Sequence, residues 1–182
     1  MELRREVVKR LLTLWEGVSR VRVVWSPGAV DALIRAMCAG ACSQRLTVQM
    51  RVRLGYALLR FLKKVAVVRA VGEICACPAE QDELKELCLD AADAMLGEWE
   101  ECDQQDDERK DALLVSMGKA AANEGLDSDE SKVWSMRERV LDCLFLALGN
   151  GVASARQPLE RLRDCEALSS ERREEIRARL ER

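Results

Sequence analysis

Residues 82–101 read DELKELCLDAADAMLGEWEE, and this stretch decides the fold class. Its apolar residues recur at intervals of three and four, which places them on one face of an α-helix, whereas a half-buried strand would alternate at intervals of two. The apolar positions are Leu84, Leu87, Cys88, Ala91, Met95 and Trp99. The stretch therefore predicts a long acidic helix, from about Pro78 to Glu101, with one buried face.

Helical spacing recurs along most of the chain. Its 182 residues include only three prolines and ten glycines, and no alternating runs are joined by Asn-Gly or Asp-Gly hairpin turns. Because 48% of the residues are hydrophobic, the chain has enough apolar material to bury a core. We predict an all-α protein made of helical bundles. Trp15, Trp99 and Trp134 lie on apolar helix faces and are expected in the core.

Two stretches predict where elements and domains begin. Ser26-Pro27 predicts the start of a helix, because serine caps a helix and proline is tolerated at the first helical position. The polar run Asp-Gln-Gln-Asp-Asp at 103–107 is the only plausible domain boundary. We therefore expect an N-terminal helical bundle at 1–103 and a C-terminal helical domain at 104–182. No internal repeat of fixed period is evident, which argues against a solenoid of identical units.

Composition excludes several classes of function. The chain has no histidine, which removes His-based catalytic triads and His-containing zinc sites, and its eight cysteines lack Cys-x-x-Cys spacing. We expect no enzyme activity, no metal and no cofactor. The cysteines sit in helical patterns, which indicates a reduced intracellular protein. No run approaches the roughly 18 apolar residues of a membrane span, and no secretory signal is present, so no membrane partner is expected.

Charge is divided unevenly along the chain. Residues 1–74 hold 14 basic and 5 acidic side chains, a net charge of +9, whereas the rest holds 15 basic and 27 acidic ones, a net charge of −12. The basic part can attract an acidic partner, or its cations can pair with acidic residues of the same molecule. The pI of about 5.3 favours internal pairing, and direct nucleic-acid binding is not expected.

Two segments carry a resemblance to a known family. Residues 54–68, LGYALLRFLKKVAVV, followed by an acidic helix ending in Ala-Met-Leu-Gly-Glu-Trp at 94–99, resemble the LW domain at the N-terminus of the transcription elongation factor TFIIS. The resemblance places an LW-like core at about 27–102. It implies four core residues in mutual contact: Leu59, Leu62, Leu96 and Trp99.

The C-terminal part is similar to the central three-helix domain of TFIIS. Leu148-Gly149-Asn150 and then Arg161-Leu162-Arg163-Asp164 stand in the order of that domain's motifs, but no zinc ribbon follows. The resemblance implies a nuclear, non-catalytic interaction module of the transcription elongation machinery, with RNA polymerase among its possible partners. Short acidic and apolar partner segments would bind at Arg60, Lys63, Lys64, Val67 and Arg69.

A second class of function fits the same residues. The chain can be a helical scaffold or adaptor unrelated to transcription, HEAT-like or death-fold-like. Two separately folding units joined near Asp103 would favour the elongation module, and one continuous bundle would favour the scaffold.

Overall fold

The computed structural model describes residues 2–20, 26–77, 82–102, 106–123, 126, 131–166 and 168–182. These residues form helices and turns, and none of them lies in a strand, so the predicted all-α class is confirmed. The helices are α1 (Glu2–Arg20), α2 (Pro27–Ala41), α3 (Val48–Leu58), α4 (Val65–Cys75), α5 (Asp82–Glu100), α6 (Asp107–Ala121), α7 (Ser131–Gly149), α8 (Arg156–Arg163) and α9 (Ser170–Leu180), with short 3-10 turns η1 (Leu59–Phe61) and η2 (Ala153–Ala155). No described helix is both long enough and apolar enough to cross a bilayer.

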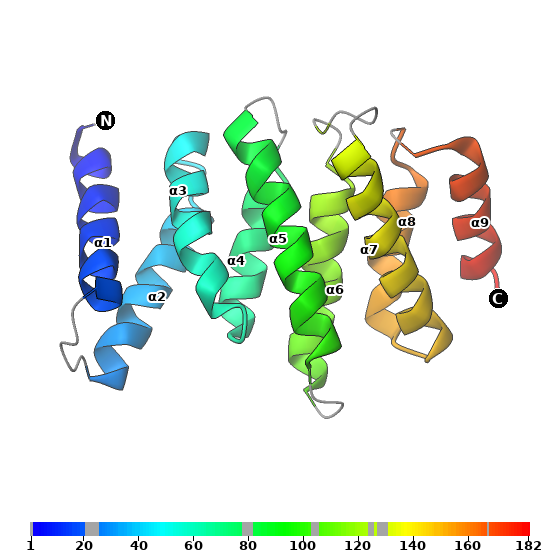
Figure 1. The fold of residues 1–182 in the computed structure, drawn as a ribbon, viewed down its shortest axis with the longest axis horizontal. Helices are drawn as coiled ribbons and strands as arrows, with labels where there is room; N and C mark the ends of the chain where they lie inside the picture. Colours follow the sequence, from blue (N-terminus) through cyan, green and yellow to red (C-terminus); the bar gives the residue numbers. More distant parts are fainter. Residues whose placement is uncertain are drawn as a thin grey trace.

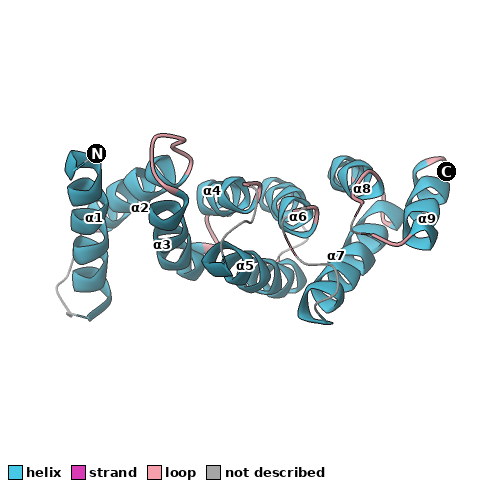
Figure 2. Ribbon diagram, turned by 90° about the horizontal axis from the view of Figure 1, so that it is seen from above, coloured by secondary structure: helices cyan, strands magenta, loops and turns pink. Residues whose placement is uncertain are grey.

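The helices stack in two layers along one axis. α2, α4, α6 and α8 pack side by side in one layer, and α3, α5 and α7 form the other, so the chain alternates between layers (Figures 1 and 2). α1 and α9 lie at opposite ends of the row, as do the two termini (Figure 1). This is an α-solenoid arrangement, in which each element packs mainly on its neighbours.

The stack continues through the expected domain boundary near residue 103. α6 packs extensively on both α4 and α5, and one core cluster runs from Val8 to Leu180. Arg109 at the start of α6 forms a largely buried ion pair with Glu98 of α5. Ser116 of α6 is buried, and its Oγ donates to the Val68 carbonyl of α4 at 3.0 Å, so buried contacts cross residue 103. We therefore describe one continuous array rather than two domains.

Glycines allow the helices of one layer to approach closely. A Cβ added to Gly72 of α4 would lie 2.5 Å from Ser116 Oγ and 3.0 Å from Ser116 Cα of α6. A Cβ on Gly118 of α6 would lie 2.4 Å from the Cβ of Pro158 in α8. A glycine therefore allows close packing both between α4 and α6 and between α6 and α8. The helices of this layer do not recur at a fixed interval along the sequence. They begin at residues 27, 65, 107 and 156, which are 38, 42 and 49 residues apart.

A buried arginine links helix ends across the layers. Arg51 of α3 donates from Nε to the Ala41 carbonyl (2.6 Å), from Nη2 to the Glu73 carbonyl (3.2 Å) and from Nη1 to Cys77 Sγ (2.8 Å). The last carbonyls of a helix have no partner within the helix, and a cation also complements the dipole there. Arg51 therefore caps α2 and α4 together, and Arg137 of α7 occupies a similar place at the end of α6.

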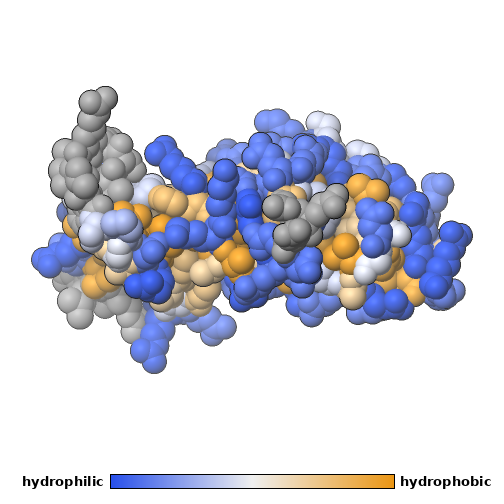
Figure 3. Space-filling view, turned by 90° about the horizontal axis from the view of Figure 1, so that it is seen from below, coloured by the Kyte–Doolittle hydropathy of each residue, from blue (hydrophilic) through white to orange (hydrophobic). Residues whose placement is uncertain are grey.

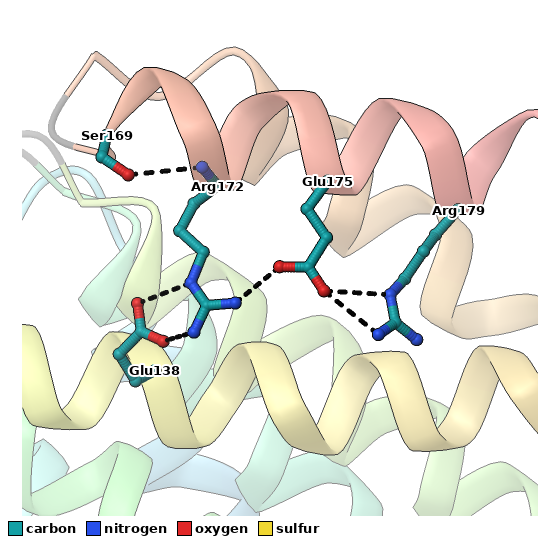
Figure 4. Close-up of polar contacts among 5 residues, drawn as sticks. All are labelled: Glu138, Ser169, Arg172, Glu175 and Arg179. Atoms are coloured by element: carbon teal, nitrogen blue, oxygen red, sulfur yellow. Dashed lines mark hydrogen bonds and ion pairs between the residues drawn. The ribbon is translucent and has the colours of Figure 1, made fainter.

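Charge pairs attach the last helix to the stack. Arg172 of α9 pairs with Glu138 of α7 and with Glu175, which in turn accepts hydrogen bonds from Arg179 (Figure 4). Ser169 caps the helix, its Oγ accepting from the Arg172 amide at 3.3 Å. The hydrogen bond from Arg172 holds the pKa of Glu175 below its usual value. The Arg172–Glu138 pair joins α9 to α7, while Ile176 and Leu180 of α9 are buried and the helix packs on α8.

Candidate partner-binding groove

A groove runs between α5 and α7 and ends in a cavity between the start of α6 and the turn that follows α7. It consists of three adjoining cavities of about 690, 530 and 700 Å³. The first and second share Arg139, and the second and third share Trp99 and Lys110. Residues on α5 line the groove from Glu86 to Glu100, a length of about 21 Å at 1.5 Å per residue. We call this surface the α5–α7 groove.

The middle of the α5–α7 groove is apolar. Leu96, Trp99, Cys143 and Leu146 line it, and the Leu146 side chain is 61% exposed, the highest value among the large hydrophobic residues described. Seen from below, apolar surface gathers between the lower end of α6 and the turn from α7 to α8 (Figure 3). A single exposed leucine is ordinary, but one beside a half-buried tryptophan in a groove offers apolar contact to a partner.

The rest of the lining is acidic. It carries seven carboxylates and three cations, a net charge of −4. The carboxylates belong to Glu86, Asp90, Asp93, Glu100, Asp107, Asp111 and Asp142, and the cations to Lys110, Lys132 and Arg139. Arg139 is paired with Asp93, so one of the three cations is already neutralised across the groove.

Two pKa shifts reflect this negative surface. Burial raises the pKa of Tyr56 on α3, and the carboxylates of Asp90 and Glu86 raise it further. Burial and the carboxylate of Glu100 raise the pKa of Cys143 to about 12. The Cys143 thiol therefore stays protonated near neutral pH and acts as an apolar contact, since the thiolate is the nucleophilic form.

Two of the cations predicted to bind a partner are engaged within the molecule. Lys64 Nζ lies 2.7 Å from Asp31 Oδ1 of α2, and Arg69 Nη2 lies 3.1 Å from Glu108 Oε1 of α6. The second pair joins the basic half of the chain to its acidic half. The +9 charge of residues 1–74 is thus partly compensated inside the same molecule, as one of the two sequence interpretations anticipated.

The remaining predicted contact residues divide between surface and core. Arg60 and Lys63 are exposed at the turn between α3 and α4. Val67 is wholly buried in α4, so its place among the partner-binding residues was wrong. Val67 lies between Lys64 and Arg69 in the sequence, but its side chain belongs to the core. None of the three cavities of the α5–α7 groove is lined by these residues.

The predicted core residues are buried to different degrees. Leu62 and Leu96 are buried, whereas Leu59 and Trp99 are partly exposed and pack against the core. Trp99 also opens onto two cavities of the α5–α7 groove. Sequence reasoning identified Trp99 and Leu96 but treated them only as core.

Sequence reasoning missed Leu146. The sequence does contain a pattern that indicates this exposed leucine. Residues 143–148 read CLFLAL, and a helix end that is apolar on all sides must make contacts on more than one face. The inward face is supplied by the core, where Leu144 and Ala147 are buried. The outward face, at Leu146, borders the groove.

No known protein family, curated protein sequence or solved structure matches this chain. Within the described residues, no group of three or more His, Cys, Asp or Glu side chains is arranged to hold a metal ion. The α5–α7 groove is therefore the feature of the described residues that points to a function.

Proposed function

We propose that this protein is a non-catalytic helical scaffold that holds a segment of a partner protein in the α5–α7 groove. The observation that carries the proposal is the groove's composition: Leu96, Trp99 and Leu146 gather in its middle cavity, and its whole lining has an excess of carboxylates. Apolar anchors of the partner would supply most of the affinity, and the charges would supply specificity.

The continuity of the stack supports a scaffold over a two-domain elongation module. α4, α5 and α6 share one core, so the chain matches the continuous arrangement that favours the scaffold class. A partner from the transcription elongation machinery, and a nuclear location, stay predictions that rest on the LW-like and central-domain-like motifs.

Binding in this groove would need little rearrangement of the scaffold. Arg139 of α7 pairs with Asp93 of α5, and both helices pack on α6, so the two walls are held by the same neighbour. A surface organised before binding loses less conformational entropy when the partner docks.

The experiment compares one substitution inside the groove with one outside it. Random 16-residue peptides displayed on phage are selected on the purified chain, and the selected pool is tested on Leu146→Asp and Leu14→Asp. Both leucines are exposed helix residues, 61% and 46%, so neither change should disturb the fold. We expect Leu146→Asp to reduce pool binding by about tenfold or more, because it places a charge at the apolar centre.

The Leu14→Asp variant is the matched control, because Leu14 lies on α1, away from the groove. It should bind the pool as the unchanged protein does. A pool that binds Leu146→Asp and Leu14→Asp equally well, or that is lost only with Leu14→Asp, would contradict the proposed function.

A further inference from the structure

We infer that the occupant of the α5–α7 groove is a basic, amphipathic helical segment of a partner protein, about 14 residues long. The inference rests on the proposed function and names the class of partner. It departs from the acidic segment predicted from the basic residues near Lys63, because the groove lies elsewhere and carries the opposite charge.

The walls of the groove favour a helical occupant. Along the first two cavities both walls are helices, whose interior backbone N–H and C=O groups are already paired with one another. An extended segment would therefore find no sheet edge to pair with, whereas a helix satisfies its own backbone groups and offers only side chains. The lined length of α5, from Glu86 to Glu100, corresponds to about 14 residues of partner helix at the same rise per residue.

The charge of the lining favours a basic occupant. Glu86 and Asp90 stand one helical turn apart on α5, are exposed, and form no ion pair with other described residues. Their field also reaches Tyr56, whose pKa they help to raise. Lysine or arginine side chains on a docked helix would meet these carboxylates. Nucleic acid and anionic lipid would be repelled by them.

The apolar centre sets where the occupant's anchors lie. Leu96 and Trp99 on α5 are three residues apart, and Leu146 faces them from α7 within the same cavity. Large apolar side chains at helical spacing of three and four on the partner would enter this cavity. Basic residues on either side of the anchors would then lie against the carboxylates of the groove lining.

The test uses two synthetic 14-residue probes with leucines at the same helical positions, one carrying lysine and the other glutamate at the remaining positions. Binding to the full chain is measured by fluorescence anisotropy at 50 and 300 mM NaCl. We expect the lysine probe to bind, to weaken at the higher salt, and to weaken about tenfold on Glu86→Lys/Asp90→Lys, because each reversal replaces an attraction by a repulsion. The glutamate probe should bind less tightly than the lysine probe.

Glu166→Lys/Glu181→Lys is the matched control. It reverses two exposed carboxylates outside the groove and makes the same change in net charge. It should leave binding of the lysine probe unchanged. Equal weakening by both double variants, or tighter binding of the glutamate probe, would overturn the inference.

Three further outcomes bear on this inference and on the proposed function. A phage-selected pool that depends on Leu146 but is not enriched in basic residues would overturn the inference and leave the proposed function standing. A lysine probe that binds Leu146→Asp unchanged would contradict both. The last outcome concerns self-association. Suppose that the unchanged chain self-associates in sedimentation and binds no probe, whereas Leu14→Asp does not self-associate and binds the probe. The occupant would then be α1 of a second copy, and the inference would be overturned.

Discussion

Replacing Gly72 by leucine should destabilise the protein by about 3 kcal/mol or more, one of the largest effects expected of a single substitution in this chain. The new Cβ would lie 3.0 Å from the backbone Cα of Ser116, which cannot move aside without shifting α6. Ser116 is itself fixed, because it is buried and its Oγ donates to the Val68 carbonyl at 3.0 Å. The change in denaturant midpoint measures the effect.

Gly97→Leu provides the control for Gly72→Leu. Gly97 is exposed on α5, and a Cβ there would meet no atom within 4 Å. Leucine at this position should stabilise the helix by about 0.5 to 1 kcal/mol, because glycine is the poorer helix former. A Gly72→Leu variant as stable as the unchanged protein would contradict the close approach of α4 and α6.

Replacing Arg137 by alanine should cost about 3 to 5 kcal/mol. Arg137 is wholly buried in α7, and its Nε and Nη2 donate to the carbonyls of Ala121 (3.0 Å) and Asn123 (3.1 Å) at the end of α6. Burial lowers the pKa of this guanidinium. Alanine would leave both carbonyls without this donor and would open a cavity, and thermal unfolding reports the loss.

Two comparison variants separate the roles of Arg137. Arg161→Ala removes an exposed arginine from α8 and should change stability by no more than about 0.5 kcal/mol. Arg137→Lys keeps a cation but loses the forked donor that spans two carbonyls, so its stability should fall between those of the unchanged protein and Arg137→Ala. Equal stabilities of Arg137→Ala and Arg161→Ala would refute the capping role.

Local signals predicted individual helices well. Ser26 caps α2 as expected, its Oγ accepting from the Ala29 amide at 3.3 Å, and Pro27 is the first helical residue. α4 forms although it is rich in β-branched residues, because Val67, Val68 and Val71 are buried in the core. Capping and apolar spacing depend on residues close in sequence, which is why they could be predicted.

The tryptophans show where apolar spacing alone is insufficient. Trp15 is buried as predicted and packs edge-on against Phe61, with ring centroids 4.6 Å apart. Trp134 was predicted to be in the core, but its side chain is 42% exposed, so that prediction was wrong. Both residues lie on apolar faces, and only the placement of neighbouring helices decides which face is covered.

The order of the stack and the groove could not be predicted from local pattern. α5 and α7 are separated in sequence by α6 and become neighbours only when the layers form, so no sequence window contains both walls. The unequal spacing of 38, 42 and 49 residues between helices of one layer also concealed the repetition. Gly72 and Gly118, which lie at the contacts between helices of this layer, are the residues in the sequence that reflect the repeated packing.

The most direct test of the groove is a map of where a bound partner segment lies. The backbone amide resonances of the full chain are assigned by NMR and followed during titration with the tightest peptide from the phage selection. The account predicts that the largest shifts fall within residues 86–100, 107–111 and 131–154, which line the α5–α7 groove. Shifts concentrated at residues 60–69, or on α1, would contradict it.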